Sequence, residues 1–311
     1  MLRFFKNFFS KKKASKVRVS VEKLSVSFGK KEIIKGLSFN VRRGQIYGIV
    51  GMSGSGKSTI LKSIVNLVNW RGCVRVNGRY GYCPQDNAFF DDLTVKENIV
   101  LFGSLNGLQE KECLKRGREL LKQLLMIDKL DSRAATLSGG QKKRLNIILS
   151  TLHSPNVLLL DEPFAGLDYY NRKVLWDFLT HLKNTGCTVL LTTHLLNEAE
   201  DYCSEVLILR DGKKFAAGRV RQILSRRGVN VVVGLRTNYL NQMKKEDVRI
   251  YCKRNKIKVL ELKKNSIIIG TSASSKESFY SFLKKRGIVF EELFSRKPDL
   301  DDVFLMSVQN V

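Results

Sequence analysis

Three short apolar runs in the first two thirds of the chain indicate the buried strands of a parallel sheet. They occupy residues 46–50, 157–161 and 188–192 and are rich in valine, leucine and isoleucine. Stretches with the spacing of amphipathic helices follow two of these runs, at residues 59–65 and 170–183. Strands that alternate with helices in this way predict an α/β fold.

Alternating apolar and polar residues mark shorter strands near the beginning of the chain. Residues 17–21 and 37–41 are predicted to form strands around a turn at residues 29–31. Another strand is expected at residues 73–76, and the dipeptide Asn77-Gly78 predicts that it ends in a tight turn.

The pattern changes between about residues 86 and 155, where an insert that is mostly helical is predicted. Amphipathic stretches at residues 95–101, 111–125 and 141–152 have the period of helices with one apolar face. This insert separates the first two buried strands of the sheet.

After residue 228 the pattern changes again, to the order strand, helix, two strands, helix, strand. This order is typical of ferredoxin-like α+β folds. The predicted elements lie at residues 230–235, 238–253, 258–262, 267–270, 276–286 and 289–294. The predicted regions are a basic aromatic tail (1–16), a main domain (17–227, with the helical insert at about 86–155) and a small α+β domain (228–311).

The net charge of the chain is its least ordinary global property. Of its 311 residues 43% are hydrophobic, which suits a globular protein, but the formal net charge is +26. Such an excess favours polyanionic partners, either nucleic acid or an anionic membrane surface. Lysine and arginine are spread along the chain, so a generally lysine-rich proteome explains the charge equally well.

The tail at residues 1–16 combines basic side chains with aromatic ones. Phe4 and Phe8 are four residues apart, as are Phe5 and Phe9. A helix at this place could therefore lie on an anionic membrane surface. A frayed tail is the alternative.

Several classes of protein are not expected from this sequence. No apolar stretch reaches the roughly 20 residues that a membrane-spanning helix needs. Lys11-Lys12-Lys13 stands where the apolar part of a secretory signal would continue. The six cysteines form no C-x-x-C pair, which favours reduced thiols. We therefore expect a cytosolic protein.

The segment from Gly51 to Ser58 matches the phosphate-binding P-loop, G-x-x-x-x-G-K-[ST]. It lies between a predicted buried strand and a predicted helix, which is the context that this motif requires. Lys57 is expected to contact the β- and γ-phosphates and the Ser58 hydroxyl to bind Mg²⁺. The expected phosphate-binding residues are Gly51, Ser53, Gly54, Ser55, Gly56, Lys57, Ser58 and Thr59. The chain is therefore predicted to bind a nucleoside triphosphate.

Two carboxylates follow the apolar run at residues 157–160. In a P-loop fold the carboxyl ends of the strands face the phosphates, so Asp161 and Glu162 are expected beside the nucleotide. Asp161 is predicted to hold the Mg²⁺ shell, and Glu162 to polarise the attacking water. An apolar run that ends in acids is common by itself, and it indicates a nucleotide site only because a P-loop precedes it in the chain.

Leu137-Ser138-Gly139-Gly140-Gln141 opens a predicted helix. Alone, this run is a capped helix start with glycines, or a second anion site at a helix N-terminus. Together with the P-loop and the two acids it resembles the signature motif of ABC ATPases. The resemblance covers about residues 17–218 and implies a P-loop NTPase of ABC type with a helical subdomain, which binds ATP and Mg²⁺.

Four further residues match motifs of this family in the expected order. Gln85 matches the Q-loop, Asp168 ends the D-loop run at residues 165–168, and His194 matches the switch histidine. Phe28 stands where the family usually has an aromatic that stacks on adenine. The resemblance implies that Gln85 touches both the Mg²⁺ water shell and the helical insert, and that His194 donates to the γ-phosphate. A core position is the alternative for Phe28 and for His194.

The resemblance also implies a dimer. In ABC ATPases the signature motif contacts the nucleotide that the P-loop of a facing copy binds, and this chain carries one set of motifs. The residues implied at that contact are Ser138, Gly139, Gly140, Gln141 and Asp168. We therefore expect a pair of ATPase domains, either two copies of this chain or this chain with a related subunit. ATP would hold the pair together, and hydrolysis would release it.

Residues 228–311 resemble the regulatory extension of exporter-type ABC ATPases. The closest likeness is the run at residues 297–305, which by itself predicts a capped amphipathic helix. One departure from the family is the short connection at residues 79–81, between Gly78 and the Q-loop. It predicts a shortened edge hairpin and leaves the phosphate site unchanged.

Two functions fit these motifs. In the first, the chain is the ATP-hydrolysing subunit of an ABC exporter and docks on a separate transmembrane permease. The docking residues would be Phe89, Phe90, Leu93 and 95–102.

In the second, the chain is a soluble ABC ATPase that acts on nucleic acid or ribosomes, which suits the charge. DNA-repair relatives carry a long coiled coil and translation-associated relatives carry two cassettes, and this sequence has neither. Nucleic acid is therefore not the expected partner. We predict an exporter subunit that is peripheral on the cytoplasmic face of the membrane.

Overall fold

The computed structural model describes residues 16–219, 222–223 and 229–308. They form two compact units. The N-terminal unit holds the described residues up to 49, residues 53–194 and residues 211–213, and the C-terminal unit holds the others. The predicted aromatic tail, apart from its last residue, and the predicted boundary at residue 228 lie outside the described residues. Both stay predictions.

An antiparallel sheet of three strands, in the order β2-β1-β4, forms one side of the N-terminal unit. The strands are β1 (Val17–Phe28), β2 (Lys31–Arg42) and β4 (Arg71–Val76). The predicted turn at residues 29–31 is confirmed, because Phe28 pairs with Lys31 and Gly29 between them has a φ of 58°.

The second sheet of this unit is parallel and positions the nucleotide motifs. Its strands lie in the order β5 (Tyr80–Cys83), β6 (Val157–Leu160), β7 (Thr188–Thr193) and β3 (Ile46–Gly51, apart from its last two residues). All residues of β3, β6 and β7 are buried, as the three apolar runs predict. The carboxyl ends of these strands lead into the P-loop, into Asp161-Glu162 and into His194. One edge of the sheet therefore gathers three of the motifs.

The edge hairpin expected after Gly78 is wrong. β4 pairs antiparallel with β1, whereas β5 pairs parallel with β6, so the strands on either side of this turn belong to different sheets. The sequence pattern also missed β5 itself. Its four residues, Tyr-Gly-Tyr-Cys, contain none of the β-branched residues that mark a buried strand.

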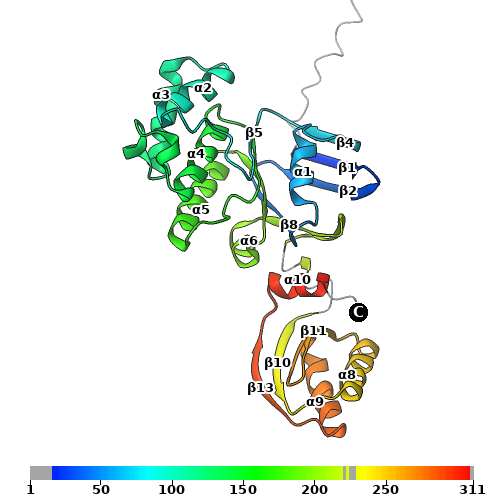
Figure 1. Ribbon diagram of the computed structural model, residues 1–311. Helices are drawn as coiled ribbons and strands as arrows, with labels where there is room; N and C mark the ends of the chain where they lie inside the picture. Colours follow the sequence, from blue (N-terminus) through cyan, green and yellow to red (C-terminus); the bar gives the residue numbers. More distant parts are fainter. Residues whose placement is uncertain (1–15, 220–221, 224–228, 309–311) are drawn as a thin grey trace, which may run out of the picture. The chain divides into compact units, whose positions relative to one another are not determined.

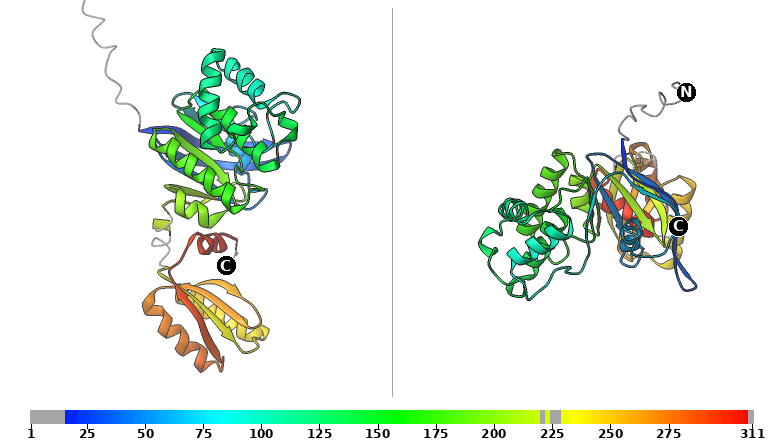
Figure 2. Two further views of the ribbon diagram at one scale, coloured as in Figure 1. Left: turned by 90° about the vertical axis from the view of Figure 1, so that its left-hand side faces the viewer. Right: turned by 90° about the horizontal axis from the view of Figure 1, so that it is seen from above.

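Helices occupy the region predicted as a helical insert. They are α2 (Val95–Leu105), α3 (Glu110–Gln123) and α4 (Gly139–Thr151), with short 3-10 turns η1 (Ile127–Lys129) and η2 (Ala134–Thr136). The other helices of the unit are α1 (Lys57–Ile64) and α5 (Tyr169–Asn184). Figure 1, and the view from above in Figure 2, show α2 and α3 at the opposite end of the unit from the antiparallel sheet.

A capping box fixes the start of α2. The Thr94 hydroxyl accepts a hydrogen bond from the Glu97 N–H over 3.1 Å, and the Glu97 carboxylate accepts one from the Thr94 N–H over 2.7 Å. Thr94→Ala is expected to destabilise this helix by about 1 kcal/mol, because the cap is lost. Faster amide hydrogen exchange in α2 would show the effect. Ser104→Ala, at an exposed position of the same helix, is the control, and equal exchange in both variants would contradict the prediction.

The C-terminal unit contains a four-stranded antiparallel sheet in the order β11-β12-β10-β13. Its elements are α6 (Leu196–Tyr202), β8 (Glu205–Arg210), β9 (Lys213–Gly218, apart from its first residue), β10 (Val231–Thr237), α8 (Gln242–Arg254), β11 (Lys258–Leu262), β12 (Ser266–Thr271), α9 (Ala273–Lys285), β13 (Phe290–Arg296) and α10 (Leu300–Val308). The elements from β10 to β13 have the predicted order, and Figure 1 shows α8 and α9 on one side of the sheet. Val248, Phe279 and Leu283 of these helices are buried in one apolar cluster with residues of β10 and β12. The assignment of this region as a separate regulatory domain stays a prediction.

Among the described residues, no helix combines the length and the apolar character that crossing a membrane requires.

Candidate nucleotide site

The P-loop joins β3 to α1 through a turn that needs glycine at two positions. Gly54 and Gly56 have φ values of 76° and 104°, in the left-handed region that residues with a side chain rarely adopt. A Cβ at Gly56 would also lie 2.5 Å from Cδ1 of Ile34. The helix then begins at Lys57, and no side chain caps it. A helix start of this kind favours an anion.

Ser58, Asp161 and Thr192 form a chain of hydrogen bonds behind the P-loop. Ser58 Oγ donates to Asp161 Oδ1 over 2.9 Å, and Thr192 Oγ1 donates to the same oxygen over 2.7 Å. Asp161 is 1% exposed, so these bonds fix its carboxylate. A carboxylate beside a serine hydroxyl is a pair of oxygen ligands of the kind that Mg²⁺ prefers.

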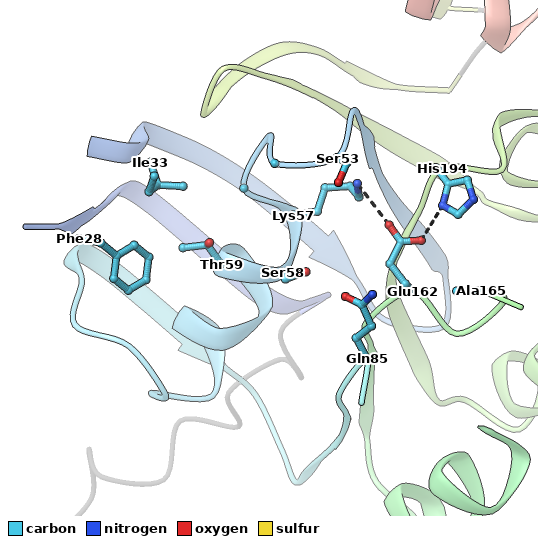
Figure 3. Close-up of a pocket in the computed structure, with 12 residues that line it drawn as sticks. Phe28, Ile33, Ser53, Lys57, Ser58, Thr59, Gln85, Glu162, Ala165 and His194 are labelled. Atoms are coloured by element: carbon cyan, nitrogen blue, oxygen red, sulfur yellow. Dashed lines mark hydrogen bonds and ion pairs between the residues drawn. The ribbon is translucent and has the colours of Figure 1, made fainter. Parts of the chain in front are cut away.

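Glu162 lies between a lysine and a histidine. Its Oε1 is 3.2 Å from Lys57 Nζ, and its Oε2 is 2.9 Å from His194 Nδ1 (Figure 3). The Glu162 side chain is 12% exposed, whereas His194 is 60% exposed. Glu162 has a φ of 47°, a conformation that costs roughly 1–3 kcal/mol and is concentrated at functional sites. The sequence motifs that predicted these three residues therefore meet in space.

A cavity of about 610 Å³ opens in front of these side chains. It is lined by Phe28, Ile33, Ser53, Gly54, Gly56, Lys57, Ser58, Thr59, Gln85, Glu162, Ala165 and His194. Figure 3 shows Phe28 and Ile33 at one end of it and Glu162 and His194 at the other. Phe28 is 53% exposed, so the alternative of a core position is wrong for it, and it is wrong for His194 as well.

The signature residues are not among those that line this cavity. Ser138 is the N-cap of α4 and exchanges hydrogen bonds with Gln141. The Gln141 N–H donates to Ser138 Oγ over 3.3 Å, and the Ser138 N–H donates to Gln141 Oε1 over 2.9 Å. Gly139 and Gly140 form the first turn of the helix behind them. The capped helix start expected from these residues is confirmed.

Asp168 also lies outside the cavity, at the N-cap of α5. Its Oδ1 accepts a hydrogen bond from the Asn171 N–H over 2.8 Å, and its Oδ2 accepts one from Asn171 Nδ2 over 2.7 Å. The backbone hydrogen bond from Asn171, and then the side-chain bond, hold the pKa of Asp168 below its ordinary value. The carboxylate is therefore ionised at neutral pH, as suits the start of a helix.

The residues present fit a phosphate chain with Mg²⁺. Ser55 Oγ is buried and has no hydrogen-bond partner within the described residues, and a ligand oxygen would provide one. A Cβ at Gly54 would meet nothing within 4 Å, so the loop has room in front of it. Within the same residues no group of three or more His, Cys, Asp or Glu side chains could hold a metal. A Mg²⁺ ion at this place would rely on Ser58, Asp161 and the oxygens of the nucleotide.

Thr192 is a residue of this site that the sequence motifs did not single out. Its Oγ1 accepts a hydrogen bond from the Glu162 N–H over 2.8 Å while it donates to Asp161, so it orients both acids. Its signal in the sequence is weak, because it is only a polar residue near the carboxyl end of an apolar run.

Comparisons with known proteins agree with this geometry. The model of the ABC transporter family matches residues 34–165. The chain is similar to the linearmycin resistance ATP-binding protein LnrL of Bacillus subtilis (strain 168), with 30% identity over 304 residues that cover 92% of this chain and 97% of that protein. It is also similar to the Nod factor export ATP-binding protein I of Ralstonia nicotianae, with 36% identity over 220 residues that cover 67% and 68% of the two chains.

Solved structures give the same result for the fold. An ATP-binding subunit of an ABC transporter matches with a TM-score of 0.64 and 30% identity, over 68% of this chain and 93% of that one. A nucleotide-free ATP-binding cassette matches with a TM-score of 0.60 at 24% identity, over 67% of this chain and 95% of that one. The predicted ABC-type fold is therefore confirmed. The chain belongs to the family of ABC transporter ATP-binding proteins.

Proposed function

We propose that this ATP-binding subunit hydrolyses ATP and thereby powers an ABC exporter. The observation that carries this proposal is the meeting of Lys57, Glu162 and His194 in front of the pair formed by Ser58 and Asp161. The relatives named for Nod factor export and linearmycin resistance support export as the direction of transport. They give no support to the alternative of a soluble ATPase on nucleic acid or ribosomes.

The cavity residues divide into those that bind the nucleotide and those that act on it. Bound Mg·ATP would supply the phosphoanhydride bond whose hydrolysis drives transport. The P-loop N–H groups and Lys57 bind the phosphates, and Phe28 stacks on the base. Ser58, Asp161 and Gln85 are the residues that would hold Mg²⁺ or its water shell.

Glu162 is the residue that we propose as the base. Its carboxylate lies at the edge of the cavity and its main chain is fixed by Thr192, so it can accept a hydrogen bond from a water in a defined position. His194 touches Glu162 and is largely exposed, so it can turn toward the γ-phosphate without disturbing the buried core.

A second ATPase domain is the first proposed partner. The signature residues and Asp168 are not among those that line the cavity of their own chain, which leaves them to complete the site of a facing copy or of a related subunit. Tyr169 and Tyr170, directly after Asp168, are 75% and 63% exposed. Large exposed side chains of this kind are typical of a surface that becomes buried in an assembly.

A separate transmembrane permease is the second proposed partner. Phe90, just past the Q-loop, is 55% exposed and lies near the Phe102 ring of α2, with 6.4 Å between the ring centroids. Leu105 at the end of the same helix is 73% exposed. We propose that the permease docks on this apolar surface and keeps the protein on the cytoplasmic face of the membrane. The tail at residues 1–16 would add a contact with the anionic membrane surface.

A pull-down in mild detergent tests this function. The tagged chain, extracted from its own membranes, is expected to retain a polytopic membrane protein at near-equal amount. Phe90→Ala should retain much less of it, while Phe28→Ala, which removes an exposed ring at the nucleotide cavity, is the control and should retain it. Recovery of ribosomal proteins or nucleic acid, with no membrane protein, would contradict the proposal.

A further inference from the structure

A buried asparagine of α4 binds the main chain of the Q-loop at three points. Asn146 Nδ2 donates to the carbonyl oxygens of Pro84 and Asp86 over 3.3 and 3.1 Å. Its Oδ1 accepts a hydrogen bond from the Ala88 N–H over 3.1 Å. Asn146 is only 3% exposed, so water does not compete for these bonds.

A lysine one turn earlier on α4 adds a fourth bond. Lys143 Nζ donates to the carbonyl oxygen of Gln85 over 2.8 Å, and this lysine is 6% exposed. Lys143 and Asn146 are three residues apart and therefore lie on one face of the helix. Four main-chain groups between Pro84 and Ala88 are thus hydrogen-bonded to side chains on this face of α4.

The Q-loop has no regular structure of its own. Residues 84–88 form neither helix nor strand, and Gln85 points its side chain into the nucleotide cavity (Figure 3). The main chain around Gln85 is therefore bound to α4, whose N-cap is Ser138 of the signature motif. From Ser138 to Asn146 the helix spans only about 12 Å.

The segment that follows is bound by a second buried asparagine. Asn98 is fully buried, and it accepts a hydrogen bond from the Phe90 N–H and donates one to the Phe90 carbonyl, each over 3.0 Å. The main chain is thus fixed on both sides of the short stretch between Gln85 and the exposed Phe90 ring.

We propose that Asn146, with Lys143, is a positioning residue that makes the Q-loop one rigid body with the signature helix. A shift of Gln85 at the nucleotide then also moves Ser138, at the N-terminus of α4. A shift of Ser138 likewise moves Gln85. This inference rests on the proposed role of Gln85 at the Mg²⁺ shell.

Two measurements on the full-length chain test this proposal, and neither needs hydrolysis. In the first, Asn146→Ala is expected to raise amide hydrogen exchange across residues 85–88 about tenfold, because the three bonds that Asn146 makes to this loop are lost. In the second, the Mg²⁺ concentration for half-maximal ATP binding is measured. It should rise several-fold in Gln85→Ala and in Asn146→Ala, and the double variant should show no more than the larger single effect.

Matched variants separate positioning from general destabilisation. Ser150→Ala removes a buried hydroxyl of the same helix whose bond, to the Ile147 carbonyl over 2.8 Å, stays within α4, so both readouts should remain as in the wild type. Lys143→Met keeps the apolar part of the lysine side chain and should raise both the hydrogen exchange and the Mg²⁺ requirement, as Asn146→Ala does. It therefore tests the proposal even if Asn146→Ala folds poorly.

Unchanged exchange at residues 85–88 in Asn146→Ala would overturn the proposal. Additive effects of Gln85→Ala and Asn146→Ala on the Mg²⁺ requirement would also overturn it, because Asn146 would then not act through Gln85. If the wild-type chain binds ATP but does not hydrolyse it, the proposed function is contradicted. The two measurements still test the positioning role of Asn146, because neither requires hydrolysis.

Discussion

Replacing Glu162 by glutamine is expected to slow ATP hydrolysis by a factor of roughly 10²–10⁴, the range that a positioned general base contributes. Glutamine has the shape of glutamate, and residue 162 contributes only its main-chain N–H to the bond with Thr192 Oγ1, so the local geometry should persist. The amide cannot take a proton from water. The chemical step is therefore lost while the site remains.

The same variant should bind ATP at least as tightly as the wild type. In the structure the Glu162 carboxylate lies 3.2 Å from Lys57 Nζ, and the Lys57 side chain is only 7% exposed. A neutral amide attracts the ammonium group less, so Lys57 becomes more available to the phosphates. With binding kept and hydrolysis lost, the proposed ATP-bound dimer should accumulate.

Steady-state ATPase rates, equilibrium ATP binding and light scattering with Mg·ATP check the three parts of this prediction. Glu110→Gln, an exposed glutamate in the first turn of α3, is the control and should behave as the wild type in all three. Undiminished turnover in Glu162→Gln would remove Glu162 from the role of base. Lost turnover without dimer accumulation would instead leave the base in place and contradict the assembly.

The nucleotide site could be predicted from the sequence because its parts stand at the carboxyl ends of three apolar runs. Such runs mark the inner strands of a parallel sheet, and the strands of such a sheet end at one edge, so position in the chain gives position in space. Lys57, Glu162 and His194 are far apart in the sequence, and the structure places Glu162 in contact with both of the others.

What the sequence did not reveal are the residues that act through main-chain groups. Thr192 and Asn146 bind N–H and carbonyl groups, which every residue has, so no pattern of side chains announces their partners. β5 was missed for a related reason: its pairing with β6 depends on the fold and not on its own residues.

Replacing Lys57 by methionine is expected to weaken ATP binding roughly ten- to hundredfold, because hydrogen bonds to a charged group are lost at about 1.5–3 kcal/mol. Methionine keeps an apolar side chain of similar length, so α1 should still form. Lys62→Met, at an exposed position in the last turn of the same helix, is the matched control and should bind ATP normally. Equal dissociation constants for the two variants would contradict the assigned role of Lys57.

The Lys57→Met variant should also unfold at a lower temperature. A second substitution can separate this loss of stability from the loss of ATP binding. Without the ammonium group, the Glu162 carboxylate, which is 12% exposed, loses the cation that lies 3.2 Å from its Oε1. Adding Glu162→Gln to Lys57→Met removes that buried charge, so the melting temperature should recover while the ATP affinity should not. If affinity and stability instead recover together, the lysine serves the fold through Glu162 and the phosphates are bound without it.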